Sequence, residues 1–295
     1  MKKYNFKEVQ KVLAIILVAN VLVAALKIIV GSIIKSASMT ADGFHSVSDG
    51  SSNIIGLIGI HFASQAEDKE HPYGHSKYET LAGLFISIML FFAGGNVILG
   101  AIEKFREPVV PEVTTMSLLA LIFTLIINIA VSTIEYKKGK ELNSQILISD
   151  SMHTRSDIYI SLGVLVTLIG VKIGAPIWID PLASLVVAGF IIHAGYEIFR
   201  DNSYILLDGE AIDSEDIRDV VMSFKEVKDI HKIRSRSSIN IINVDLHLVV
   251  DPELDVEESH YLVHNIEDAI KDKFNKNLQL IAHVEPYEDS KKVIS

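Results

Sequence analysis

Apolar residues are gathered into six long blocks over the first two thirds of the chain, whereas polar and apolar residues are mixed in the last third. Each block is close to the roughly 20 residues that an α-helix needs to cross a bilayer. The blocks cover residues 12–34, 41–64, 81–102, 114–134, 146–171 and 181–198. We therefore predict a mainly α membrane protein with six transmembrane helices.

A short basic segment, residues 1–11, precedes the first block and superficially resembles the start of a secretory signal. The block that follows is long enough to span the membrane, and no small-residue cleavage site separates it from the next one. We expect a retained first helix rather than a cleaved leader.

The last third of the chain has the pattern of a small α+β domain. Asp213 begins an acidic run that can cap a helix and that suits the positive end of its dipole. Apolar and polar residues alternate from Val244 to Val250, as in a half-buried strand. The predicted order is a helix from 214 towards 224, strands at 230–236 and 239–250, a helix at 256–274 and a strand at 278–284. This αββαβ unit is small for an enzyme core but sufficient for a dimerising or sensing module.

Lysine and arginine predict the orientation of the six spans, because these residues are enriched on the cytoplasmic side. With the N-terminus inside, the inner connections hold ten basic residues and the outer ones hold four. An even number of spans returns the C-terminal region to the cytoplasm. We thus predict a cytoplasmic N-terminus at 1–11, a transmembrane domain at 12–200 and a cytoplasmic domain at 201–295, in a multi-pass protein of the cell membrane.

Composition supports this division of the chain. Of its 295 residues, 49% are hydrophobic, and the mean hydropathy is +0.35, which is ordinary for a membrane protein. The net charge is −10, and an excess of nine negative charges lies in residues 200–295. An acidic domain excludes a nucleic-acid partner and suits cations. Because there is no cysteine, disulfides are excluded and any metal site must use histidine and carboxylate.

The second and fifth blocks share the spacing Asp-x-x-His-x-x-x-Asp, although such segments should avoid charge. Residues four apart lie on one face of a helix, so each His and the Asp after it can aim at a common point. Two such helices supply two imidazoles and two carboxylates, the tetrahedral set that zinc prefers. The residues are Asp42, His45 and Asp49 in the second block and Asp150, His153 and Asp157 in the fifth.

The alternative is that these groups are isolated polar residues satisfied by hydrogen bonds between helices. Burying four ionisable groups costs about 3 kcal/mol each on insertion scales, which favours a functional site. Asp42 and Asp150 stay ambiguous: they can orient the ligands from outside, guide the incoming ion or cap local backbone.

The loop between the second and third blocks carries a second cluster, Asp68, His71 and His75, with room for bends at Pro72 and Gly74. Taken alone it could be an ordinary solvated loop. Beside the paired motifs, we interpret it as a metal-delivery or regulatory site.

Histidines are also enriched in the C-terminal domain, which holds five of the chain's 11. Surface histidines are common, but a convergence of histidine and carboxylate favours zinc. The candidates are His231, His247, His260, His264, His283 and Glu285.

Together, the paired His-x-x-x-Asp motifs and the loop from His71 to Glu79 resemble the cation diffusion facilitator family of metal efflux transporters. The resemblance covers nearly the whole chain. It implies a homodimer, a ferredoxin-like cytoplasmic domain and exchange of metal for protons. By this similarity the transport site is His45, Asp49, His153 and Asp157, the loop site is Asp68, His71 and His75, the cytoplasmic binuclear zinc site is His231, His247, His260, His283 and Glu285, and Lys77 with Asp208 form a charge interlock of the dimer.

Two positions depart from the pattern of related members. Relatives often carry aspartate at the position of His45, and manganese-type members carry Asn and Asp at the positions of His45 and His153. Histidine at both positions favours zinc as the substrate, while cobalt, cadmium, iron and manganese stay open as alternative substrates. Glu285 stands where an aspartate is common, which affects the expected geometry of the cytoplasmic site.

We therefore predict a zinc exporter coupled to protons, with Zn²⁺ as substrate and as bound regulatory ion and with no organic cofactor. Metal binding requires neutral histidines, so uptake of metal expels protons and reprotonation expels metal. A membrane metallohydrolase is the first rival, but no His-Glu-x-x-His motif is present. A membrane metal sensor without transport is the second, although a sensor has little use for ligands buried in the membrane.

Overall fold

A computed structural model describes residues 5–33, 37–106, 115–172, 176, 178–238, 241–274 and 277–288. The side chains of residues 27, 30–33, 37–49, 115–117, 120, 164, 167–172 and 180 lie outside this description. The chain forms two compact units, residues 5–203 and the residues from 204 onward, and each is described by itself.

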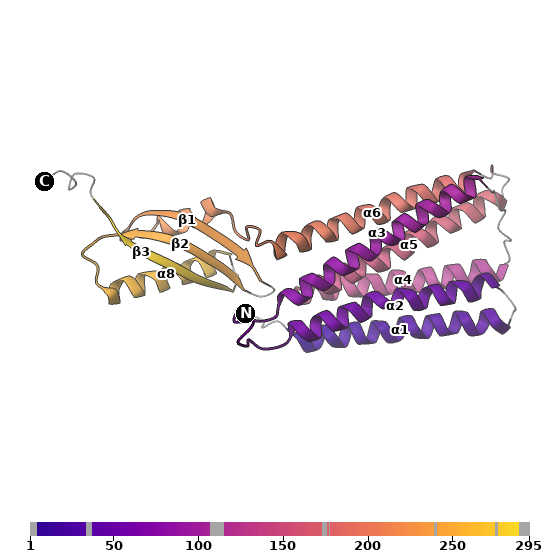
Figure 1. The fold of residues 1–295 in the computed structure, drawn as a ribbon, viewed down its shortest axis with the longest axis horizontal. Coiled ribbons are helices and arrows are strands. Elements are labelled where there is room, and N and C mark those ends of the chain that lie inside the picture. The colour runs from indigo at the N-terminus through magenta and orange to yellow at the C-terminus, as the bar shows by residue number, and fades with distance from the viewer. Residues whose placement is uncertain are drawn as a thin grey trace. The chain divides into compact units, whose positions relative to one another are not determined.

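The first unit consists of long helices that overlap the six apolar blocks one by one (Figure 1). They are α1 (Phe6–Ile33), α2 (Ala37–Ala63), α3 (Lys77–Arg106), α4 (Thr115–Leu142), α5 (Gln145–Lys172) and α6 (Ile179–Leu206). Most run beyond the predicted ends, because hydropathy marks only the part that suits lipid, whereas a helix continues through charged residues. The mainly helical fold is therefore confirmed.

Three of these helices are apolar and long enough to cross a membrane within the described residues: Phe6–Leu26, Lys77–Arg106 and Pro181–Leu206. The described parts of α2, α4 and α5 are not among them: the apolar part of α2, Gly50–Ala63, is too short, and all three helices carry polar and ionisable residues. Several of these residues are buried inside the unit, among them Asn53, Glu135, Asp150 and Ser151. The count of six spans stays a prediction.

Helices α3, α5 and α6 pack through an apolar cluster. Leu90 of α3 meets Val187, Ile191 and Ile198 of α6, and Tyr159 of α5 packs against them. Close approach of α3 to α6 depends on a glycine, since a Cβ added at Gly94 would lie 2.7 Å from Ile192 Cγ1.

A buried carboxylate links α3 to the start of α5. Glu79, which is fully buried, accepts hydrogen bonds through Oε1 from Ser144 Oγ at 2.6 Å and from the Ile146 backbone N–H at 3.2 Å. Ser144 precedes the first residue of α5, and its Oγ accepts from Leu147 N at 3.4 Å, as an N-cap does. The beginning of α5 is thus held by a negative charge from α3.

The second unit contains α7 (Ser214–Val221), β1 (Val227–Ser237), β2 (Ile242–Val250), α8 (Val256–Phe274) and β3 (Leu278–Pro286). The αββαβ order is confirmed, and Asp213 caps α7 as predicted by accepting from the Glu215 N–H at 2.9 Å. Several bounds were wrong: α7 ends at Val221, before a turn, and β3 continues to Pro286, so that Glu285 lies in the strand. In addition, β1 begins at Val227 and β2 at Ile242.

The three strands lie in the order β1-β2-β3, with β1 antiparallel and β3 parallel to β2. Alternation along β2 separates two faces, as predicted. Val244, Leu246 and Leu248 enter the core, where they meet Ile217 of α7 and Ile266 of α8. The other face of the sheet carries the polar residues of β2, including Asp245 and His247.

Candidate functional site: candidate metal clusters

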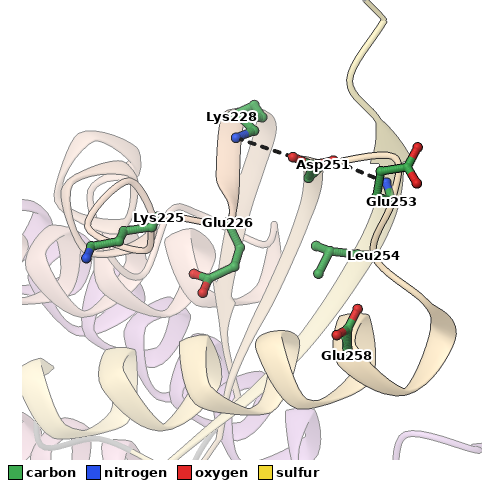
Figure 2. Close-up of a pocket in the computed structure, with 7 residues that line it drawn as sticks. All are labelled: Lys225, Glu226, Lys228, Asp251, Glu253, Leu254 and Glu258. Atoms are coloured by element: carbon green, nitrogen blue, oxygen red, sulfur yellow. Dashed lines mark hydrogen bonds and ion pairs between the residues drawn. The ribbon is translucent and has the colours of Figure 1, made fainter.

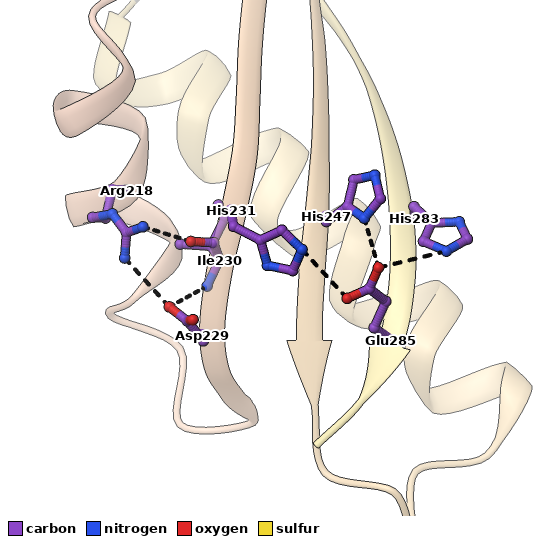
Figure 3. A network of polar contacts seen from close by, with 7 residues as sticks. All are labelled: Arg218, Asp229, Ile230, His231, His247, His283 and Glu285. Atoms are coloured by element: carbon purple, nitrogen blue, oxygen red, sulfur yellow. Dashed lines mark hydrogen bonds and ion pairs between the residues drawn. The ribbon is translucent and has the colours of Figure 1, made fainter. Parts of the chain in front are cut away.

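Three histidines form a row across the sheet of the second unit, one from each strand (Figure 3). His231 of β1 pairs directly with His247 of β2, and His247 pairs with His283 of β3. Their ring centroids are 5.1 Å and 4.7 Å apart along the row. The ladder register therefore places all three imidazoles at one level, on the face away from α8.

Glu285 joins the histidines from two residues further along β3. Its Oε1 lies 2.6 Å from His247 Nδ1 and 3.7 Å from His283 Nε2, and its Oε2 lies 3.4 Å from His231 Nε2. Ligand atoms of His231, His247 and Glu285 all fall within 4.8 Å of one another, which suits a single metal ion.

The same contacts set the charge of Glu285. Its pKa lies below the ordinary range, chiefly because His247 donates a hydrogen bond to the carboxylate and because the three imidazoles attract it when protonated. The carboxylate is therefore ionised and ready to bind a cation near neutral pH.

A polar network holds the part of β1 that precedes His231. Arg218 of α7 donates to the Ile230 carbonyl at 2.6 Å and pairs with Asp229 at 3.4 Å. A register irregularity follows His231, and Lys232 has φ of 52°. Such a bulge re-aims a neighbouring side chain.

Within one chain, the structure does not bring His260 to this cluster. His260 lies on α8, whose apolar side packs on the opposite face of the sheet, and its ring contacts that of His264 at 4.4 Å. His264 also pairs with Glu267 at 3.7 Å. The periodicity of α8 fixes this placement, because Leu262 and Ile266 are buried and the histidines lie on the outer side.

The predicted loop cluster is compact. Ligand atoms of Asp68, His71 and His75 lie within 4.8 Å of one another. Asp68 Oδ1 is 3.3 Å from His71 Nδ1, and its Oδ2 is 3.4 Å from His75 Nε2. His75 is buried, and its Nδ1 has no hydrogen-bond partner among the described residues.

Backbone hydrogen bonds shape this loop. Asp68 Oδ1 accepts from the N–H groups of His71 at 2.6 Å and Glu70 at 2.9 Å. The His71 bond is the main reason why the pKa of Asp68 lies below its usual value. Gly74 takes φ of 81°, a left-handed conformation that favours glycine and brings His75 back toward Asp68.

Of the four predicted transport ligands, the structure describes two. His153 is buried and Asp157 is half-buried, one turn apart on α5. The side chains of His45 and Asp49, and that of Asp42, lie outside the described residues.

A contact on the described part of α2 nevertheless joins the two motif helices. Asn53, one turn after Asp49, donates its side-chain amide to Asp150 Oδ2 of α5. Asn20 of α1 donates to Asn53 Oδ1 at 2.9 Å. Asp150, one of the ambiguous acids, therefore connects α2 with α5 one turn before His153.

Two residues of this region escaped the sequence analysis. Glu135 of α4 is fully buried beside Asp150 and accepts from Thr154 Oγ1 at 3.0 Å. It is the first residue beyond the predicted fourth span, so hydropathy placed it outside the membrane. Tyr136 next to it supplies the partner of Arg155, whose guanidinium lies 4.6 Å from the ring centroid. Arg155 of α5 thus contacts α4.

The proposed interlock between Lys77 and Asp208 spans the two units and stays a prediction. Within its own unit, Asp208 lies 3.7 Å from Arg236.

A pocket of about 470 Å³ lies elsewhere on the second unit (Figure 2). It is lined by Lys225, Glu226, Lys228, Asp251, Glu253, Leu254 and Glu258. Lys228 Nζ is 3.7 Å from Asp251, so the basic and acidic groups partly neutralise each other. None of the described residues that line it is a histidine, and it shares no residue with the row of histidines and Glu285.

The chain matches two family models. Residues 13–207 match the cation efflux transmembrane domain, and residues 210–287 match the cytoplasmic domain of cation efflux proteins. An uncharacterized transporter of Methanocaldococcus jannaschii is 34% identical over 270 residues, which cover 90% of this chain and 93% of the relative.

Two relatives from Bacillus subtilis are named for their metals. The manganese efflux system protein MneP is 30% identical over 292 residues, covering 94% of this chain and 96% of the relative. The cadmium, cobalt and zinc/H(+)-K(+) antiporter is 29% identical over 247 residues, covering 82% and 79%.

The helical unit and the cytoplasmic domain that these matches define make this chain a multi-pass membrane transporter, not an enzyme. It belongs to the cation diffusion facilitator family and exports metal ions.

Proposed function

We propose that the chain exports a divalent transition metal, foremost zinc, across the cell membrane in exchange for protons. His45, Asp49, His153 and Asp157 hold the ion. The observation that carries this proposal is the bond from Asn53 to Asp150, which draws α2 and α5 together one turn from both predicted ligand pairs.

Proton exchange follows from the ligand chemistry. Imidazole binds metal only when neutral, and its ordinary pKa of about 6.5 lies near cellular pH. Protons arriving from outside therefore compete with metal for His45 and His153. One relative's name includes zinc/H(+)-K(+) antiport, which supports the same coupling.

The loop and cytoplasmic clusters regulate transport in this proposal. Metal on His231, His247, His283 and Glu285, with His260 supplied by a second copy, would stabilise a homodimer when the cytoplasmic metal concentration rises. The row lies on the sheet face opposite to the one on which α8 packs, and this placement supports the role.

Manganese is the second candidate substrate, since MneP is 30% identical over nearly the whole chain. Imidazole-rich sites suit zinc, whereas manganese prefers all-oxygen donors. We therefore expect zinc to be transported ahead of manganese.

The test is metal flux into proteoliposomes that contain a metal-sensitive dye, with an imposed pH gradient. We expect zinc flux that depends on the gradient and is abolished by Asp157→Ala. His193→Ala is the matched control, because His193 is an exposed histidine on α6. Flux that survives Asp157→Ala would contradict the assigned site, and absence of flux with every metal would contradict transport.

A further inference from the structure

Two buried acids lie in contact between α4 and α5, and neither is one of the predicted transport ligands. Glu135 and Asp150 are fully buried and interact directly through their carboxylates. Thr154 donates to Glu135 Oε2 at 3.0 Å, and Asn53 donates to Asp150 Oδ2.

One oxygen of each carboxylate is left over. Glu135 Oε1 and Asp150 Oδ1 are buried and accept no hydrogen bond from the described residues. Ionised carboxylate oxygens are acceptors only, so two carboxylates in direct contact need a proton or a cation between them. Among the described residues, the charged groups with the largest effect on Glu135 are themselves acids, Asp150 and Asp157.

Charge balance favours a divalent ion over a single shared proton at this position. A single shared proton would leave one negative charge buried among helices, which costs several kcal/mol. A divalent cation would neutralise both carboxylates. The available donors are oxygens, which bind hard divalent ions well.

The pair also lies on the route that transport requires. Asp150 is three residues before His153 on α5, which is about 4.5 Å along the helix axis. In the predicted orientation α5 starts in the cytoplasm, so the pair lies between the cytoplasm and the transport ligands. Glu135 is in turn close enough to Asp157 to influence it electrostatically.

We propose that Glu135 and Asp150 form a second divalent-cation site on the cytoplasmic side of the transport ligands, where an incoming metal ion binds before it reaches His153 and Asp157. This inference rests on the proposed direction of transport. Two adjacent sites of moderate affinity allow an ion to enter readily and still leave, as conduction through a pore requires.

The test counts Mn²⁺ bound to the full-length protein in detergent micelles, from the loss of the electron paramagnetic resonance signal of free Mn²⁺. Mn²⁺ suits oxygen donors and reports binding directly. The parent variant carries four substitutions that disable the other candidate sites. His75→Ala removes a ligand of the loop cluster, and His247→Ala removes one of the row. Asp49→Ala and His153→Ala remove one transport ligand each from α2 and α5.

We expect this parent to retain one bound Mn²⁺ per chain. Glu135→Gln and Asp150→Asn each keep the side-chain shape and should weaken binding about tenfold or more, as loss of a charged ligand does. Glu141→Gln is the matched control, because Glu141 is an exposed acid on α4 that pairs with Lys138. It should leave binding unchanged.

A parent that binds no Mn²⁺, or binding that survives both amide substitutions, would overturn the site. Glu135→Asp keeps the negative charge and should retain Mn²⁺ binding, so it separates the loss of a ligand from the loss of the fold. If Glu135→Asp does not bind Mn²⁺ although it elutes from a size-exclusion column as the parent does, that result would also count against the site. Binding in micelles needs no transport, so this result and the flux assay can fail independently.

Discussion

The link from Glu79 to the start of α5 leads to a quantitative prediction for Glu79→Ala. The substitution removes the buried acceptor of Ser144 Oγ and of the Ile146 N–H. Leaving a buried donor unsatisfied costs about 1–3 kcal/mol. Loss of a negative charge at a helix N-terminus adds about 0.3–1 kcal/mol. We expect the free energy of unfolding to fall by about 1–4 kcal/mol in total.

Glu79→Gln is the control for this prediction. It keeps a side-chain carbonyl oxygen that can accept both bonds, so it should lose only the charge–dipole part, about 0.3–1 kcal/mol. The measurement is unfolding of the purified protein in mixed micelles with increasing SDS, followed by circular dichroism.

A double-mutant cycle with Ser144→Ala decides whether the contact carries the effect. Because Ser144 donates to Glu79, the two alanine substitutions should be non-additive, with a coupling energy of about 1 kcal/mol or more. Strict additivity would refute the reasoning, since the loss in Glu79→Ala would then arise elsewhere.

Three further predictions concern packing, the α4–α5 contact and pH. Gly94→Ala should destabilise the helical unit by about 1–3 kcal/mol through overpacking, whereas Gly95→Ala, which meets nothing within 4 Å, should be neutral or stabilising in the same unfolding assay. Tyr136→Leu should cost about 0.5–2 kcal/mol by removing the ring beneath Arg155, while Tyr136→Phe should cost less; equal losses would exclude the cation–π contact. Because the pKa of Glu285 is lowered in the folded protein, its stabilising effect without metal is complete above the ordinary carboxyl range and is lost as pH falls through the lowered value. The protection factors of the β2 and β3 amides, which are exchange rates corrected for the intrinsic effect of pH, should therefore fall on acidification, and less so in Glu285→Gln; an identical pH profile in both would contradict this cause.

The helices and the αββαβ order could be predicted from the sequence because hydrophobic period and length determine them locally. Motif spacing likewise identified His153 and Asp157 as neighbours on one face of a helix. Glu135 could not be found in this way, since an acid just past an apolar block looks like an end of a span. Only the packing of α4 against α5 shows that it is buried.

The row of histidines could not be predicted from local sequence patterns. His231, His247 and His283 could be named as candidates, but their alignment depends on the register of two strand pairs that no local pattern specifies. The whole of α8 lies between β2 and β3 in the chain, so the register of β3 against β2 cannot be predicted from neighbouring residues. His260 was among the candidates as well; within one chain the fold places it on the helical layer, and its part in the site stays a prediction.

The alignment of the row across β1, β2 and β3 has a mechanical consequence. Successive side chains of a strand point to opposite faces, so sliding β3 by a single residue would turn His283 toward the core and remove it from the row. An ion bound by side chains of neighbouring strands would therefore fix the register of these strands. The edge strand β3 could not shift its register while the ion stayed bound.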